Sequence, residues 1–582
     1  MTALQATADP SDVPAVVADP HRLRRRVLLT LTFLGLILLM LRPSWHSLTT
    51  KVPDLGDPVL YGWSWNWTRH AVFTDPGRLF DGNIFWRHHL TVAYTDNMLV
   101  LLVPFSLLRA AGASWALQLN ALSLGMVFGS LAATFSLARR IVGRTDASIF
   151  AAIAYTFGAF TFAHLGHLQL LLLGQFPLGF LLMFRWFERR RARDAVWFGL
   201  LNASFFLGAL YYAAIWMVCV AVVLIGYLVM TRFRPGPRFA RGLVIVAVCS
   251  ATAIPFVLPY VQLGQQRPLI PEWGLQPRDL LNVAPGSFLY PGIDSWANAS
   301  VDRGEHTFFP GFSTELLAAV GLGALLWSRR TARARGPVEL SRDRRRELWL
   351  MILAAGAAVV LSLGPEVRGH TLPFTWFHNH VPGFAGIRVA ARLALPGLLV
   401  GAILAAVGIA AIARRVPART ARVIVLGLCG FLLVELAAPL THATLPDGAR
   451  TLAVYRELAR KPAGAVVELP IANPADGGEW AQIEAPRMLY SMLDFHPRIN
   501  GYSGTSPTDY LGRRARFNRF PAPISLRAAR NLGVRYVVLH VGVFAGYLQY
   551  TDAQIRSIVA GLPPGATAHP YGNAWLVDLG RA

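Results

Sequence analysis

Two aspartates near the start of the chain could do acid–base chemistry. Asp54 and Asp57 lie in the segment Pro53-Asp54-Leu55-Gly56-Asp57-Pro58, which follows the first long apolar run. A carboxylate beside an apolar surface has a raised pKa, so it can act as a general base that takes the proton of an attacking hydroxyl group. The structural alternative is a turn or a helix start, for which Asp-Pro is an ordinary signal.

The rest of this loop, which ends at Asn97, adds aromatic and acidic groups. Four aromatic residues follow one another at a spacing of two: Tyr61, Trp63, Trp65 and Trp67. They fit either an aromatic belt at the membrane surface or stacking platforms for a sugar or lipid. Asp96 is either a second acidic group or the N-cap of a short apolar helix over 98–108.

Two pairs of basic residues occur at helical spacing. His164 and His167 suit two metal ligands, but no third ligand has a fixed spacing to them, so we expect them to line a cavity. Arg388 and Arg392 lie four residues apart at the outer start of a predicted helix over 387–412, so they would share one helix face. Their guanidinium groups would either bind a phosphate or extend toward lipid headgroups.

Composition indicates what must position these residues. The 582-residue chain is 54% hydrophobic and only 15% charged, whereas soluble proteins carry about 25% charged residues. The net charge of +23 comes from arginines in short bursts between apolar runs, which is typical of cytoplasmic loops and leaves no basic stripe for nucleic acid. The three cysteines lie in apolar runs and form neither a disulfide framework nor a metal site.

The apolar runs predict an all-α polytopic membrane protein. We expect about eleven transmembrane helices, at 27–42, 115–138, 147–163, 168–186, 195–211, 213–231, 243–262, 311–327, 348–364, 387–412 and 422–440. Arginine bursts in every second connection place the N-terminus in the cytoplasm. The run 98–108 is too short to span and is expected to lie as a juxtamembrane or re-entrant helix on the outer face.

The predicted domains follow from this pattern. Residues 1–20 are a disordered cytoplasmic tail, and 21–440 form the transmembrane domain with outer loops 43–97 and 263–310. Residues 441–582 change to a small extracytoplasmic α/β domain. Its predicted strands are 465–469, 535–539 and 574–578, and its predicted helices are 450–460, 480–493 and 525–532.

Several motifs together resemble the GT-C glycosyltransferases, integral membrane enzymes that take a sugar from a polyprenyl-phosphate donor. The resemblance covers roughly residues 25–510. It rests on Asp54…Asp57-Pro58-Val59-Leu60-Tyr61, His164-Leu165-Gly166-His167, the segment Pro382–Arg392, Val467-Glu468-Leu469-Pro470 and Asn500-Gly501-Tyr502-Ser503-Gly504. The last three are similar to bacterial members that carry a C-terminal extracytoplasmic domain. The family often has two adjacent acidic residues, which are separated here, so the base is either Asp57 or Asp54.

The resemblance implies inverting transfer of a sugar from a polyprenyl-phosphate donor to a lipid, glycan or protein acceptor outside the cytoplasmic membrane. In it, Arg388 and Arg392 would hold the donor phosphate. The residues expected on the remaining substrate surface are His164, His167, Arg303, Asp96 and Tyr61. No cofactor is required, although some members use a divalent metal ion and one is compatible with this chain.

Two other classes of function compete with this one. A flippase or transporter of lipid-linked glycans would explain the spans and the outer arginines, but it would not need Asp57. A non-catalytic protein of cell-envelope assembly would explain the C-terminal domain, but none of the polar outer groups.

Overall fold

The structure is a computed structural model that describes residues 20–232, 234, 236–264, 267–293, 303–330 and 340–580. Met1–Arg42 and Pro43–Ala582 form two compact units. The described part of the first unit is one helix, α1 (Pro20–Leu41), in which four arginines precede a continuous apolar stretch. This stretch coincides with the predicted first span.

In the second unit, five helical segments are long and apolar enough to cross a membrane. They are α5 (Trp115–Val142), α6 with α7 (Thr145–Thr156, Ala159–Ala163), η4 with α8 (Leu168–Gly174, Gln175–Arg189), α10 (Leu210–Met230) and η9 with α17 (Ala390–Ala394, Leu395–Ala413). A sixth span results if α11 (Pro237–Ala251) and α12 (Ile254–Leu263), bent by 57°, cross as one. The protein is therefore a helical membrane protein.

Helices also occupy the remaining predicted spans of this unit, namely α9 (Ala192–Phe206), α14 (Phe312–Arg330), α15 (Arg342–Ser362) and α18 (Ala418–Leu436). The count of about eleven spans stays a prediction. α14 and α17 approach each other very closely, because a Cβ added to Gly321 would lie 2.0 Å from the carbonyl oxygen of Leu404. Small residues allow this kind of backbone contact between membrane helices.

The first outer loop contains more helix than its sequence predicts. α2 (Trp45–Thr50) lies at its start, and α3 (Asp57–Thr74) begins at the Asp-Pro signal. Tyr61, Trp63 and Trp65 are fully buried in α3. Both expectations for the aromatic series were therefore wrong: at 3.6 residues per turn these side chains point in different directions, and α3 is buried around most of its circumference.

Short elements complete the outer face. The run 98–108 forms η3 (Leu99–Leu101) and α4 (Leu102–Ala110), about 18 Å long at 1.5 Å per residue, which is too short to span. The others are η1 (Pro76–Arg78), η2 (Thr91–Tyr94), η5 (Pro271–Trp273), η6 (Pro277–Leu281), η7 (Arg303–His306), α16 (Pro373–His380), η8 (Phe384–Gly386) and the hairpin β2 (Glu366–Val367) with β3 (His370–Thr371).

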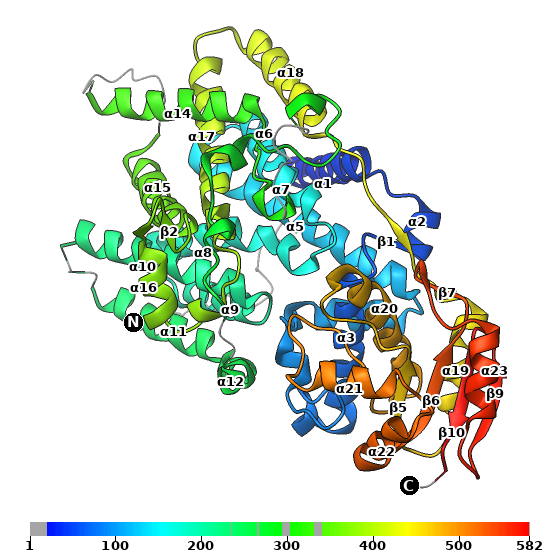
Figure 1. The fold of residues 1–582 in the computed structure, drawn as a ribbon. Coiled ribbons are helices and arrows are strands. Elements are labelled where there is room, and N and C mark those ends of the chain that lie inside the picture. Colours follow the sequence, from blue (N-terminus) through cyan, green and yellow to red (C-terminus); the bar gives the residue numbers. More distant parts are fainter. Residues whose placement is uncertain are drawn as a thin grey trace, which may run out of the picture. The chain divides into compact units, whose positions relative to one another are not determined.

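Residues after 440 form the expected α/β region, drawn from gold to red in Figure 1. Its sheet has the order β5-β6-β10-β9, with β5 and β6 parallel and the other pairs antiparallel. The strands are β5 (Ala465–Leu469), β6 (Val534–His540), β9 (Thr567–Tyr571) and β10 (Ala574–Asp578), and the helices are α19 (Ala449–Leu458), α20 (Gly477–Tyr490) with η10 (Ser491–Leu493), α21 (Tyr510–Phe517), α22 (Pro523–Leu532) and α23 (Asp552–Ala560).

This region packs against the first outer loop. α20 lies along α3 (Figure 1), and β1 (Lys51–Val52) pairs with β4 (Ala443–Thr444). A second hairpin, β7 (Val543–Phe544) with β8 (Tyr547–Leu548), follows β6. The boundary predicted at 440/441 remains a prediction, since 43–582 cluster as one compact unit.

Candidate active site

Asp57 lies at the N-terminus of α3, where Pro58 occupies the first turn. The partial positive charge of a helix N-terminus stabilises a carboxylate at this position. The hydroxyl group of Tyr502 donates a hydrogen bond of 2.7 Å to Asp57 Oδ1. On the other side, His167 Nε2 lies 3.9 Å from Asp57 Oδ2. The carboxylate therefore has one firmly bonded oxygen and one that faces an imidazole at longer range.

Asp54 has a more structural environment than Asp57. Its Oδ1 accepts a hydrogen bond of 2.6 Å from the backbone N–H of Gly56. Its Cβ lies so close to Gly166 that a Cβ added there would be 3.2 Å away. Burial raises the pKa of Asp54, and the charge of Asp57 adds to this rise against the hydrogen bond from Gly56. Asp54 thus shapes the turn that presents Asp57, as the structural alternative expected.

The two histidines follow α7 but have different surroundings. His164 is buried, and its Nδ1 lies 2.8 Å from the carbonyl oxygen of Phe160 while its Nε2 lies 3.4 Å from Glu305 Oε2. His167 is partly exposed and faces Asp57. Burial lowers the pKa of His167, against the opposing attraction of Asp57. Only His167 therefore has its imidazole directed at the candidate base.

Arg392 is buried and paired. Its guanidinium group donates to both carboxylate oxygens of Glu305, with 2.8 Å from Nε to Oε2. Burial alone would raise the pKa of Glu305, but the charge of Arg392 and the hydrogen bond with His164 outweigh it and hold that pKa well below the ordinary value. This pair leaves Arg392 with its charge already balanced.

The expectation that Arg388 and Arg392 share a helix face was wrong. Arg388 lies in the extended segment before η9, Arg392 lies in η9, and the α-helix begins only at Leu395. The reason is Pro396: inside an α-helix its ring would clash with the carbonyl group four residues earlier, that of Arg392.

Arg388 is exposed and has a different role from Arg392. Its guanidinium group stacks over the ring of Trp273 with its central carbon 4.6 Å from the ring centroid. The backbone N–H of Arg267 donates to the carbonyl oxygen of Ala385 at 2.8 Å, three residues before Arg388, and burial with the charge of Arg388 lowers the pKa of Arg267. Neither has an ion-pair partner among the described residues. An anion would be attracted to this pair.

Arg267 was not identified from the sequence as a site residue, and neither was the role of Tyr502. Arg267 donates a hydrogen bond of 2.8 Å to the carbonyl oxygen of Gly504, in the same loop as Tyr502. The signal that could have found this loop is its glycines. A Cβ added to Gly501 would lie 2.7 Å from the ring of Phe85, so another chain segment approaches closely there.

The remaining predicted residues make no hydrogen bond to the Asp57 carboxylate within the described part of the structure. Asp96 Oδ1 accepts a hydrogen bond of 2.9 Å from the backbone N–H of Leu210, so it caps α10 and not the helix over 98–108. Tyr61 is fully buried. Arg303 lies in η7, and its side chain is outside the described part of the structure. Within that part, no three His, Cys, Asp or Glu residues gather as they would around a metal ion.

The cap formed by Asp96 yields a prediction about pH. Burial raises the pKa of Asp96 to about 6, against the hydrogen bond from Leu210 and the charge of Arg392. Because the folded-state pKa exceeds the unfolded value of about 3.9, ionisation removes stability as the pH rises from about 4 to about 6, and this loss is complete above that range. Asp96→Asn keeps an acceptor for Leu210 and carries no charge. It should therefore stabilise the protein at pH 7.5 by on the order of 2 kcal/mol, and by less at pH 4.5.

Thermal unfolding of the purified protein in detergent at both pH values measures this difference. Asp75→Asn is the control, because Asp75 is exposed and makes no side-chain cap bond. An equal shift of Tm at both pH values, or a loss of stability at pH 7.5, would contradict the assignment.

Comparison with known proteins identifies the fold. No family model and no curated protein matches the chain. Among solved structures, it is similar to the mycobacterial arabinofuranosyltransferase AftD, with a TM-score of 0.56 and 14% identity over 96% of this chain and 40% of that one. A variant of AftD gives a TM-score of 0.57 with 14% identity over 96% of this chain and 42% of the other.

The oligosaccharyltransferase of Archaeoglobus fulgidus aligns with a TM-score of 0.46 and 14% identity, over 88% of this chain and 67% of that one. The chain spans about two fifths of the length of AftD. As the sequence resemblance implied, the chain has the fold of the GT-C glycosyltransferases.

Proposed function

We propose that this protein is a membrane glycosyltransferase that moves a sugar from a polyprenyl-phosphate donor to a lipid, glycan or protein acceptor at the outer face of the cytoplasmic membrane. The observation that supports it most is the position of Asp57. This carboxylate, partly exposed at a helix N-terminus, is bonded to Tyr502, and Gly504 of the same loop binds the outer arginine Arg267.

In the proposed reaction, Asp57 takes the proton of the acceptor hydroxyl group. At the same time, the oxygen of this hydroxyl group attacks C1 of the donor sugar. The bond between C1 and the phosphate oxygen breaks as the new glycosidic bond forms, and the phosphate leaves with the electron pair. Attack from the face opposite the phosphate inverts the configuration at C1. The reaction needs no redox step, and the proton ends on the Asp57 carboxylate.

The leaving phosphate requires positive charge, and we assign this role to Arg388 with Arg267. The sequence had assigned it to Arg388 with Arg392. Arg392 is already neutralised by both oxygens of Glu305, and separating a buried ion pair leaves an uncompensated charge. Arg388 and Arg267 have no carboxylate partner among the described residues, so binding a phosphate breaks no ion pair.

The proposed topology has eleven crossings, with the N-terminus in the cytoplasm and residues 441–582 outside. It rests on the alternation of arginine bursts along the chain. It places Asp57, Arg388 and Tyr502 on one side of the membrane, as their proximity in the fold requires.

The reaction predicts that the purified protein transfers labelled sugar from a polyprenyl phosphate, and that Asp57→Asn loses transfer by at least about a hundredfold, since general-base catalysis contributes 10²–10⁴-fold. Asp54→Asn should lose less, because its carboxylate mainly holds the turn. Radiolabelled product is the measurement. Full transfer by both variants would refute the catalytic assignment, and donor binding without product by the wild type would favour a transporter.

The phosphate assignment predicts different defects for the outer arginines. Arg388→Ala and Arg267→Ala should each lower kcat/KM for the donor about tenfold to a hundredfold, the worth of a charge-assisted hydrogen bond. Arg392→Ala should instead lower Tm, because Glu305 is left buried and unpaired.

Steady-state kinetics and thermal unfolding separate these two effects. Arg278→Ala is the control, an exposed arginine in η6 of the same outer loop. A normal kcat/KM for Arg388→Ala would refute the assignment of the donor phosphate to Arg388.

The topology predicts that alkaline phosphatase fused after Leu440 is active, because the enzyme folds only outside the cytoplasm. A fusion after Arg193, in a predicted inner loop, should be inactive. Enzyme activity normalised to fusion protein is the readout. The reverse pattern would overturn the eleven-span count.

A further inference from the structure

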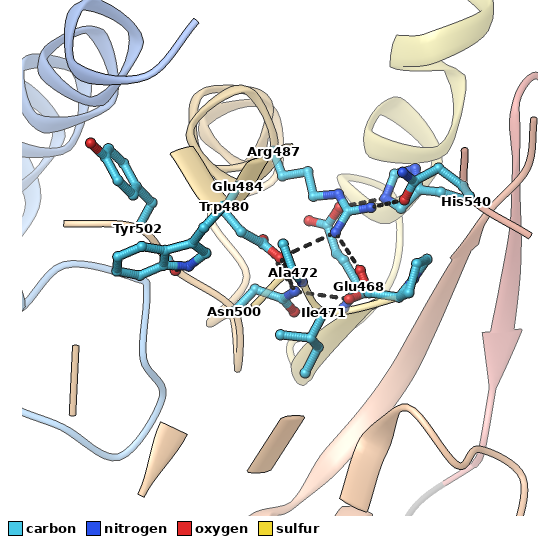
Figure 2. Close-up of polar contacts among 12 residues, drawn as sticks. Glu468, Ile471, Ala472, Trp480, Glu484, Arg487, Asn500, Tyr502 and His540 are labelled. Carbon is cyan, nitrogen blue, oxygen red and sulfur yellow. Dashed lines mark hydrogen bonds and ion pairs between the residues drawn. The ribbon is translucent and has the colours of Figure 1, made fainter. Parts of the chain in front are cut away.

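Tyr502 joins the C-terminal region to the candidate base. Its hydroxyl donates the hydrogen bond to Asp57 Oδ1, and burial together with the charge of Asp57 raises the pKa of Tyr502 well above its ordinary value. Tyr502 therefore remains a neutral donor at physiological pH. In Figure 2 its hydroxyl points away from the buried polar residues of the C-terminal region.

The loop that carries Tyr502 is held from the C-terminal side by specific bonds. Trp480 Nε1 donates to the carbonyl oxygen of Gly501 at 2.9 Å, and the rings of Trp480 and Tyr502 meet edge to face, with centroids 4.9 Å apart. Asn500 Nδ2 donates to the carbonyl oxygen of Glu468 at 2.8 Å and to Glu484 Oε1 at 3.1 Å. Both the backbone and the ring of Tyr502 are therefore fixed.

These anchors rest on a buried charged cluster behind them (Figure 2). Glu468 accepts hydrogen bonds from Arg498 Nε and His540 Nε2, each at 2.9 Å. Burial alone would raise the pKa of Glu468, but the hydrogen bond from His540 and the charge of Arg498 hold it at about 2. A buried cluster with its charges paired has few alternative arrangements, so it fixes the position of Asn500.

The same loop is held from the other side by both outer loops, 43–97 and 263–310. The backbone N–H of Phe85 donates to the carbonyl oxygen of Asn500 at 3.0 Å, and Arg267 donates to Gly504. A Cβ added to Gly504 would lie 2.9 Å from the carbonyl oxygen of Tyr94. Residues 500–504 are thus clamped between two parts of the outer face.

We propose that Tyr502 is a positioning residue that holds Asp57 Oδ1 and thereby leaves Oδ2 as the oxygen that accepts the proton. The terminal torsion of an aspartate is broad and roughly two-fold, so a free carboxylate would present either oxygen in many orientations. One short hydrogen bond from a clamped loop fixes the plane of the carboxylate. Oδ2 then faces the side of His167, where an acceptor hydroxyl can approach. This inference rests on the proposed glycosyl transfer.

The inference assigns a catalytic contribution to the C-terminal region. A misplaced catalytic group costs up to about a hundredfold in rate. Tyr502→Phe keeps the ring contact with Trp480 and loses only the hydroxyl group. It should therefore lower kcat for sugar transfer about tenfold or more, and should leave KM for the donor within about twofold.

Tyr490→Phe is the matched control. Tyr490 is a buried tyrosine of α20 whose hydroxyl has no hydrogen-bond partner among the described residues, so its loss should leave kcat unchanged. Thermal unfolding of both variants checks that each is folded. In addition, Tyr502→Phe should have no further effect on the residual rate in the Asp57→Asn background, because it acts through Asp57.

The outcomes separate this inference from the function on which it rests. If Asp57→Asn is inactive while Tyr502→Phe keeps kcat within twofold of the wild type, the positioning role is wrong and the proposed function stands. If Tyr502→Phe lowers Tm and kcat together, or lowers the rate equally with and without Asp57, its role is structural and the inference fails. If the wild type transfers no sugar, the proposed function itself fails.

Discussion

The candidate site depends on backbone hydrogen bonds between two segments more than four hundred residues apart. Phe85 and Trp86 donate to the carbonyl oxygens of Asn500 and Arg498, and Arg498 donates to that of Asn83 at 2.6 Å. Closing a loop of this length costs conformational entropy, and the contacts between the two segments must offset that cost. Together with the packing of α20 on α3 and the β1–β4 pair, this pairing brings Tyr502 to Asp57, so the candidate site is assembled from the two ends of the second unit.

Buried charge gives that pairing its specificity. Arg498 lies at its centre, with its backbone bonded to Asn83 and its side chain to Glu468 and Asp494. Desolvated charges are costly unless all of their partners are in place, so a shifted register would leave Glu468 or Arg498 unpaired. An apolar contact would tolerate such a shift more readily. The cluster therefore favours one arrangement of the outer loop, even though replacing it with apolar residues could raise stability.

Local sequence patterns predicted where the helices and strands lie, but they did not predict which of these elements contact one another. Apolar runs indicated α5 and α17, and β-branched runs indicated β5, β6 and β10. The edge strand β9, Thr567–Tyr571, was missed because its sequence is polar and contains Pro570. Pro396 was a sequence signal that the α-helix begins after Arg392, so that Arg388 and Arg392 do not share a helix face. The partners of Asp57 and Arg392 could not be predicted, because Tyr502 and Glu305 lie far from them in sequence and no local period connects them.

The two outer arginines show why position along the chain does not decide function. Arg388 and Arg392 have the same chemistry and lie four residues apart, but Nε and Nη2 of Arg392 donate to the two carboxylate oxygens of Glu305 while Arg388 stacks on Trp273. Stacking leaves the donor groups at the rim of a guanidinium free to bind an anion. A bidentate carboxylate occupies two of those donors and balances the charge, so Arg392 attracts an incoming phosphate weakly unless Glu305 is displaced and left unpaired. The counter-charge supplied by a distant loop therefore determines which of the two guanidinium groups keeps an unbalanced positive charge.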